Sequence, residues 1–380
     1  MKILLTSTQY PGNGGAATNT YKLNKYFLSQ KIKTYCIFIL CQREDISKIN
    51  IDPDNLGNVS YIRCSVKNGE PLDYDHKKYI KYTPNFINQF KNKIIKYLGG
   101  TPDIILSKNY LAPITSHFLF PESKIYYLVS GLFYMSILNN YRDEFISAQM
   151  VLNKPNYYVK LIDSFKKHPI FINILQEIQT LKMVDRVIYN SQLTCNLSKL
   201  YFGDLIKNET IINTSLLKHI DNTCDNFNTR PYDIIFVSSS FKRKIKNPPF
   251  VNKLFLDKRL SLYKKIVIGD NNIFDPQIEN ITILNQQLNS KVLEYMKNSK
   301  LLILPSLFDS SPNTIYEALE AGCNIVTSKN IGNYQIFNRD SICEDVYDIE
   351  EWIQKIRNNL DKKIINNINV GNIIDELLEY

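Results

Sequence analysis

The sequence predicts an α/β protein with two doubly wound domains that face each other across a cleft. Short runs rich in β-branched residues alternate with segments of helical periodicity from the first residue, a pattern typical of parallel sheets covered by helices. The alternation stops at a polar segment, residues 217–230, and then starts again. Because domains of about 150 residues are common, the chain length also suits two domains. We expect an N-terminal domain at 1–218 and a C-terminal domain at 219–380.

The N-terminal domain is predicted to open with a strand at residues 2–7, a glycine-rich turn at 11–15 and a helix. Leu23, Tyr26 and Phe27 recur at the spacing that places apolar side chains on one helical face. The same reasoning predicts strands at 34–40, 59–64, 103–106, 125–129, 186–190 and 210–213, and helices at 84–98, 172–184 and 192–201.

The C-terminal domain repeats the strand and helix alternation. Strands are expected at 233–238, 264–268, 281–284, 301–304 and 324–327, and helices at 289–298 and 313–321. Two amphipathic stretches, 349–360 and 364–378, are predicted to be closing helices. In doubly wound domains ligands bind at the carboxyl ends of the strands, so the functional residues are expected there.

Composition narrows the classes of function. With 44% hydrophobic and 22% charged residues, the chain has the composition of a packed globular protein, which excludes disordered and fibrous classes. No apolar run reaches the roughly 18 residues of a membrane span, and no secretory segment is recognised, so we expect a cytoplasmic protein. The seven scattered cysteines and four histidines lack metal-binding spacing, so no metal is expected. The net charge of +9 suits an anionic cosubstrate.

The most informative stretch is residues 301–322, Leu301 to Gly322. A buried strand is predicted to end at Pro305, and a polar loop leads into a helix that Gly322 stops. Asp309 precedes this helix and Glu317 lies within it, eight positions later. Carboxylates can accept hydrogen bonds from the hydroxyl groups of a sugar, and the amides of a helix N-terminus suit a phosphate. The stretch therefore indicates a sugar and phosphate site.

This arrangement resembles the E-x7-E donor motif of retaining GT-B glycosyltransferases, family 4 (glycosyl transferases group 1) in particular, with Asp309 in place of the first Glu. The string PSLFDSSPNTIYEALEAGCNIVTS is similar to the longer family pattern around that motif. Residues 2–28 and 183–203 also resemble family segments, so the likeness covers most of the chain. It implies the GT-B fold, in which two Rossmann-like domains face each other.

The resemblance also implies an activity. A metal-independent glycosyltransferase of the hexosyltransferase type would move a sugar from a nucleotide-diphosphate donor to an acceptor hydroxyl, with retention of the anomeric configuration. The acceptor would be a glycan or a protein-linked or lipid-linked group. No cofactor besides this nucleotide-sugar cosubstrate is implied, and no nucleic acid partner.

Residue roles follow from the same resemblance. Glu317 would hold ribose hydroxyls and Asp309 a hydroxyl of the donor sugar. Lys244, with Arg243 as the alternative, would neutralise the diphosphate as it leaves. The remaining substrate-binding residues would be Gly14, Gly15, Ser130, Gly131, Ser240, Gln287, Leu288, Ser310, Ser311, Asn313 and Thr314.

Two positions depart from the family pattern. Where the family has an Arg after the first strand of the second domain, the simplest register places Ser239, and it places Lys244 at the family Lys. Arg243 could supply the missing cation if the loop is shifted. Ser130 stands where a His before the glycine is common, although Gly131 is kept.

Three other interpretations stay open. The departures at Ser130 and Ser239 would suit a catalytically inactive, glycosyltransferase-like binding subunit. The spacing of Gly12, Gly14 and Ala17 also fits the dinucleotide fingerprint of an NAD-dependent oxidoreductase, but the expected acid at the end of the second strand is missing. Finally, the basic stretches 88–96 and 165–167 would allow peripheral contact with an anionic membrane.

Overall fold

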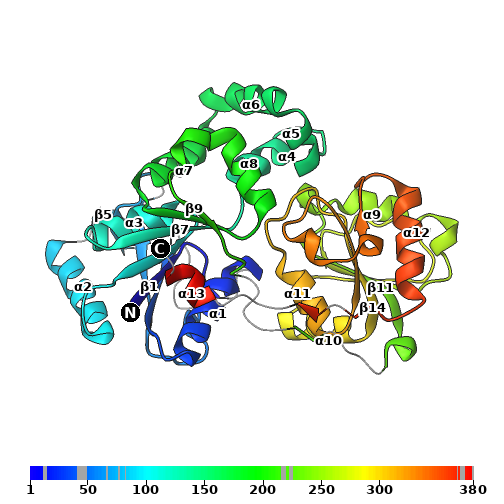
Figure 1. Cartoon of the computed structure of the whole chain (residues 1–380), viewed down its shortest axis with the longest axis horizontal. Coiled ribbons are helices and arrows are strands. Elements are labelled where there is room, and N and C mark those ends of the chain that lie inside the picture. The colour runs from blue at the N-terminus through cyan, green and yellow to red at the C-terminus, as the bar shows by residue number, and fades with distance from the viewer. Residues whose placement is uncertain are drawn as a thin grey trace. The chain divides into compact units, whose positions relative to one another are not determined.

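The computed structural model describes residues 1–11, 15–40, 49–65, 67–75, 78–81, 83–214, 220–221, 226–365, 367–368 and 373–378 (Figure 1). Its contacts divide the chain into two units. Unit 1 comprises residues 1–133, 163–190 and 194–217, and unit 2 comprises 134–162, 191–193 and 218–380. The expected boundary between residues 218 and 219 placed residues 134–162 in the N-terminal domain. These residues make their contacts in unit 2 instead.

Unit 1 is built on a nine-stranded sheet in the order β5-β4-β3-β2-β1-β6-β7-β8-β9. The neighbouring strands from β3 to β9 in this order run parallel, and β4, near one edge, runs antiparallel to both β3 and β5. The strands are β1 (Lys2–Ser7), β2 (Lys33–Leu40), β3 (Val59–Cys64), β4 (Pro71–Asp75), β5 (Lys78–Lys81), β6 (Ile104–Lys108), β7 (Lys124–Val129), β8 (Arg186–Tyr189) and β9 (Glu209–Ile211).

Among the described residues, five α-helices lie wholly or mainly in unit 1: α1 (Gly15–Ser29), α2 (Pro84–Leu98), α3 (Leu111–Leu119), α7 (Ile172–Met183) and α8 (Gln192–Phe202). Helix α2 has the bounds predicted from the sequence, because both of its ends carry strong local signals. Thr83 caps the first turn by accepting a hydrogen bond from the Phe86 amide, and Gly99 ends the helix in the left-handed conformation at φ 76°. Its buried face packs Ile94 and Leu98 against the sheet.

Unit 2 contains a six-stranded, fully parallel sheet in the order β13-β12-β11-β14-β15-β16. The chain adds β12 and β13 on one side of β11 and then crosses to add β14, β15 and β16 on the other. The strands are β11 (Tyr232–Ser240), β12 (Lys265–Asp270), β13 (Ile281–Leu284), β14 (Ser299–Leu304), β15 (Asn324–Ser328) and β16 (Ile342–Cys343). The switch point of this sheet therefore lies between β11 and β14.

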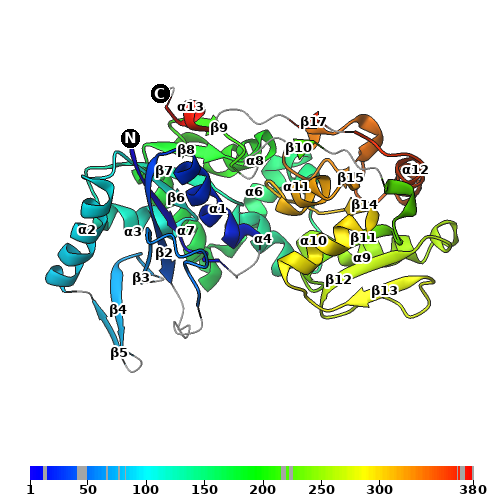
Figure 2. The same ribbon diagram turned by 90° about the horizontal axis from the view of Figure 1, so that it is seen from below.

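Helices cover both faces of the unit 2 sheet (Figure 2). The core on one face joins Phe236, Val267 and Ile303 of the strands to α9 (Pro248–Phe255) and α12 (Ile349–Leu360). Trp352 of α12 is fully buried there. The other face is covered by α10 (Asn289–Lys297) and α11 (Asn313–Glu320), which contact β14 and β15. The remaining helices assigned mainly to unit 2 by contacts are α4 (Phe133–Asn140), α5 (Ala148–Asn153), α6 (Pro155–Asp163) and α13 (Ile373–Leu378).

One predicted element is wrong. The stretch 364–378 is not a single helix, because Asn367–Ile368 forms β17, which pairs antiparallel with β10 (Ile220–Asp221), and α13 begins only at Ile373. The periodic apolar residues favoured a helix. However, the stretch 366–372 contains four asparagines and a glycine, which are poor helix formers and disfavour helix over these residues.

A buried carboxyl group lies in unit 1 between α7 and β7. Glu177 is almost fully buried, and its Oε1 accepts a hydrogen bond of 3.3 Å from the Tyr127 hydroxyl. Its Oε2 has no hydrogen-bond partner among the described residues. Burial raises the pKa of Glu177 from 4.5 to about 8, because a charged carboxylate is poorly solvated there.

This pKa shift predicts a pH dependence of stability. Between about pH 4.5 and 8 the folded protein keeps a proton on Glu177 that the unfolded chain has released, so the free energy of unfolding should fall as the pH rises. Glu177→Gln keeps a neutral side chain and should flatten this dependence. Urea unfolding at several pH values measures it, with the exposed Glu122→Gln as control. Parallel profiles for wild type and Glu177→Gln would contradict the prediction.

Candidate active site

The loop between β14 and α11 carries the first predicted acid. Asp309 pairs with Ile331 in an isolated parallel bridge, with its amide donating to the Asn330 carbonyl at 3.1 Å. The Gly332 amide donates back to the Asp309 carbonyl at 2.6 Å. A Cβ added at Gly332 would lie 1.8 Å from the carbonyl oxygen of Ser310, so only glycine allows this close approach of the two loops. The backbone of Asp309 is thus fixed from one side.

The side chain of Asp309 contacts a lysine that the sequence analysis did not select. The Nζ atom of Lys246 lies 2.5 Å from Oδ2 of Asp309, and only 11% and 21% of the two side chains are exposed. Lys246 follows β11 and Asp309 follows β14, the two strands that flank the switch point. The pair therefore lies where ligands bind in doubly wound sheets.

Helix α11 places the other predicted donor-site residues on one face. Asn313, Thr314 and Glu317 are half-buried and share a helical face at spacings of three and four residues. The remaining residues of the helix up to Leu319 are buried in unit 2. As predicted, Gly322 ends the helix in the left-handed conformation at φ 76°.

The loop residues before α11 are packed tightly. Ser310 and Ser311 are buried, and the hydroxyls of Ser311 and Tyr316 lie 3.3 Å apart. The first amides of a helix cannot be satisfied by intrahelical bonds, and Pro312 at the N-cap supplies no side-chain cap. The N-terminus of α11 can therefore offer N–H groups to an anion.

The structure does not bring the predicted cations Lys244 and Arg243 to Asp309. The Nζ atom of Lys244 donates to the Arg142 carbonyl at 2.5 Å and lies 5.6 Å from the centre of the Phe145 ring. Arg243 is exposed and contacts the Ser239 hydroxyl at 3.2 Å. Of the three basic side chains in the loop after β11 named here, Lys246 is the one that reaches the acid.

The other predicted residues of unit 2 lie further along the same sheet edge. Ser240 ends β11, and its hydroxyl accepts from the Asn271 side chain at 2.9 Å. Gln287 and Leu288 follow β13, the edge strand, which β12 separates from β11. Leu288 is 78% exposed. These residues share the carboxyl edge with Asp309 but do not contact it.

In unit 1 the predicted Ser130 belongs to a polar chain across three adjacent strands. Its hydroxyl donates to Oδ1 of Asn109 at 2.7 Å, and Nδ2 of Asn109 donates to the Thr8 hydroxyl at 2.8 Å. Thr8, Asn109 and Ser130 follow β1, β6 and β7, and the switch point of this sheet lies between β1 and β6. Asn109 was not predicted as a site residue. Its signal in the sequence is an Asn directly after an apolar strand, and the structure places it in the left-handed conformation at φ 70°.

Two glycine positions complete the predicted set in unit 1. A Cβ at Gly131 would meet no atom within 4 Å, so the space beside it is open. Gly15 is the first residue of α1, and Gly14 lies outside the described residues.

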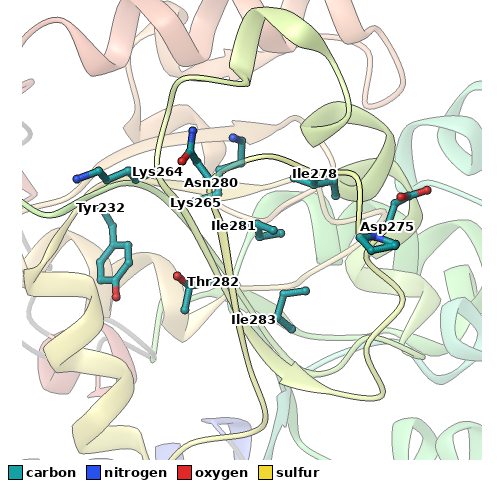
Figure 3. Close-up of a pocket in the computed structure, with 10 residues that line it drawn as sticks. Tyr232, Lys264, Lys265, Asp275, Ile278, Asn280, Ile281, Thr282 and Ile283 are labelled. Atoms are coloured by element: carbon teal, nitrogen blue, oxygen red, sulfur yellow. The ribbon is translucent and has the colours of Figure 1, made fainter.

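A cavity of about 520 Å³ lies elsewhere in unit 2 (Figure 3). Tyr232, Lys264 and Asn280 line it at the amino ends of the strands, on the opposite edge from Asp309. The buried Lys265 donates to the carbonyls of Tyr263 and Glu279 at 2.8 and 2.9 Å. This hydrogen bonding gives Lys265 a structural role. We therefore place the candidate site at the carboxyl edge.

Both basic stretches considered for membrane contact use part of their charge within the fold. In α2, Lys93 donates to the Ser60 hydroxyl at 3.0 Å, and Lys91 lies over the Phe120 ring. Lys166 pairs with Asp163 at 3.1 Å. No described helix is both long and apolar enough to cross a membrane. Within the described ranges, no group of three His, Cys, Asp or Glu side chains is arranged to hold a metal ion.

Residues 274–369 match the model of the family Glycosyl transferases group 1. This part of the chain is similar in sequence to group 1 glycosyltransferases. The match contains Asp309, α11 and β15, so the resemblance seen in the sequence is confirmed where the predicted donor motif lies. No curated protein matches the chain.

Solved structures of similar fold span nearly the whole chain. Sucrose-phosphate synthase from Thermosynechococcus elongatus shares 11% identity at a TM-score of 0.58, over 95% of this chain and 93% of that one. The UDP-forming trehalose-phosphate synthase from Burkholderia xenovorans, in complex with glucose-6-phosphate, shares 9% at 0.54, over 95% and 92%. An E. coli trehalose-6-phosphate structure bound with UDP-2-fluoro glucose shares 10% at 0.54, over 96% and 91%. The predicted GT-B fold is confirmed.

Proposed function

We propose that this chain transfers a sugar from a nucleotide-diphosphate donor to an acceptor hydroxyl, with retention of configuration. The contact between Lys246 and Asp309 at the switch point carries the proposal, because it brings a cation and a carboxylate together in the loops before α9 and α11. The group 1 family match, which covers Asp309 and α11 but not Lys246, and the UDP-sugar bound in one structural neighbour support it.

Each group has a chemical task in this proposal. Glu317 accepts hydrogen bonds from ribose hydroxyls, and Asp309 accepts one from the donor sugar. Lys246, in the role that the sequence suggested for Lys244 or Arg243, and the first amides of α11 neutralise the diphosphate. As the bond from the sugar to the diphosphate breaks, the diphosphate takes the electron pair. The acceptor oxygen bonds to the sugar on the same face and passes its proton to the leaving diphosphate oxygen. Stabilising the developing charge is the main catalytic contribution.

The proposal is tested first by binding. A panel of nucleotide sugars is added to the purified protein, and the true donor should raise the melting temperature, because a ligand stabilises by RT ln(1 + [L]/Kd). Hydrolysis and transfer are then measured with that donor. Binding without either reaction would favour an inactive binding subunit, and stabilisation by a dinucleotide alone would favour the oxidoreductase alternative.

Removing divalent metals should leave the transfer rate nearly unchanged. Lys246 and the helix amides already supply the positive charge that a metal ion would bring to the diphosphate. The transfer rate is measured with donor, acceptor and EDTA-treated enzyme and is compared with the rate of the untreated reaction. A rate that disappears with EDTA and returns with Mg²⁺ or Mn²⁺ would contradict the prediction. The proposed reaction needs no cofactor besides the nucleotide sugar.

A further inference from the structure

Residues 142–149, which comprise most of the connection from α4 and the first two residues of α5, contact three loops at the carboxyl edge of the unit 2 sheet. We call this segment the brace. It comes from the N-terminal half of the sequence, but its contacts place it in unit 2. The loops it touches follow β11, β14 and β15, and these are the loops that carry Lys246, Asp309 and Asn330.

Hydrogen bonds tie the brace to each loop. The loop after β11 donates from Nζ of Lys244 to the Arg142 carbonyl, at 2.5 Å. The loop after β14 accepts at the Leu307 carbonyl from the Ala148 amide, at 2.7 Å. The loop after β15 accepts at Oδ1 of Asn330 from the Gln149 amide, at 2.8 Å. One segment of eight residues thus fixes three separate loops.

The same loops are joined to one another at the candidate site. The Leu307 amide donates to the Ile245 carbonyl at 2.8 Å, directly before Lys246. The Asn330 carbonyl accepts a hydrogen bond from the Asp309 amide. Asn330 therefore contacts the brace through its side chain and contacts Asp309 through its backbone carbonyl. Asn330 is fully buried at 1% exposure. Any shift of the brace would therefore act on both members of the Asp309–Lys246 pair.

The brace is itself held in one conformation. The Asn139 side chain both donates to the Ile146 carbonyl and accepts from the Ile146 amide, at 3.0 and 3.1 Å. Ser147 caps α5 by accepting from the Met150 amide. Tyr347, which precedes α12, donates to the Phe145 carbonyl at 2.8 Å. A segment anchored in this way can serve as a fixed reference for the loops.

We propose that the brace sets the geometry of the Asp309–Lys246 pair, and that Lys244 and Asn330 are positioning residues for it. Lys244 then acts through the Arg142 carbonyl and the Phe145 ring rather than by touching the diphosphate. The consequence for catalysis rests on the proposed function, but the positioning of the loops does not. Loop positioning can be measured without any substrate.

The experiment compares Lys244→Met with Lys244→Arg, which keeps a donor for the Arg142 carbonyl and a cation over Phe145. Lys291→Met is the matched control, since Lys291 forms an exposed ion pair with Glu294 on α10. Hydrogen–deuterium exchange is followed in peptides covering residues 305–311 and 328–332 of the full chain. Lys244→Met should speed exchange there about three- to ten-fold, the size expected for the loss of one hydrogen bond, and Lys244→Arg and Lys291→Met should not.

Transfer kinetics with the donor identified by the binding panel form the second arm. Lys244→Met should lower kcat/KM about ten-fold, through both kcat and the donor KM because both members of the pair are displaced, and Lys244→Arg should restore it. Unchanged exchange in Lys244→Met would overturn the proposal. If that variant also showed a large loss of kcat, Lys244 would be a direct diphosphate ligand instead. If the wild type shows no activity, the proposed function fails and the exchange arm still decides whether the brace holds the loops.

Discussion

Replacing Lys246 by alanine should slow sugar transfer by about 10² to 10³-fold, since a preorganised electrostatic contact of this kind contributes about 3 to 4 kcal/mol to the transition state. The charge on the diphosphate develops as the sugar leaves, so the loss should appear more in kcat than in the donor KM. Steady-state kinetics with the donor varied at saturating acceptor measure both parameters.

The neighbouring cations provide the control. Lys244→Ala and Arg243→Ala should cost less than Lys246→Ala, because neither side chain reaches Asp309. Lys246→Arg should recover part of the rate, since it keeps a cation beside the carboxylate. If Lys244→Ala or Arg243→Ala carries the large loss of kcat and Lys246→Ala does not, the assignment of the diphosphate cation to Lys246 is wrong.

Most strands of the two large sheets could be predicted from the sequence because they are apolar, β-branched runs with a clear end, but the strands β4, β5 and β16 were not predicted. Residues 59–64 and 281–284 have the same bounds in the structure as in the prediction. Helices α3 to α6 were not predicted. Helix α3 is short and contains Pro113, which the first turn tolerates, and α5 has only six residues. Such elements form because they pack in the fold, since short helices have little stability alone.

The two carboxylates of the candidate site were selected from the sequence, but the lysine that contacts Asp309 was not. Counting from Ser239 assumed a regular strand, whereas β11 has a register shift between Val237 and Ser240. Asn247 in the left-handed conformation then ends the short turn that carries Lys246. An irregularity of this kind changes which residue of the following loop reaches the site, and no sequence pattern indicates that change. Lys246 and Asp309 are also 63 positions apart, so their contact follows only from the order of β11 and β14 in the sheet.

Replacing Glu317 by alanine should weaken binding of the donor nucleotide about 10- to 150-fold. A carboxylate that accepts hydrogen bonds from ribose hydroxyls contributes about 1.5 to 3 kcal/mol, and alanine leaves those hydroxyls without an acceptor. The fold should survive, because Glu317 lies on the half-buried face of α11 and alanine is a good helix former. Calorimetric titration of the donor nucleotide measures the affinity, with the exposed Glu320→Ala, one turn further along α11, as the matched control. Unchanged affinity in a folded Glu317→Ala protein would show that this face of α11 does not hold the ribose, and the donor would then have to be bound through Asp309, Lys246 and the helix amides alone.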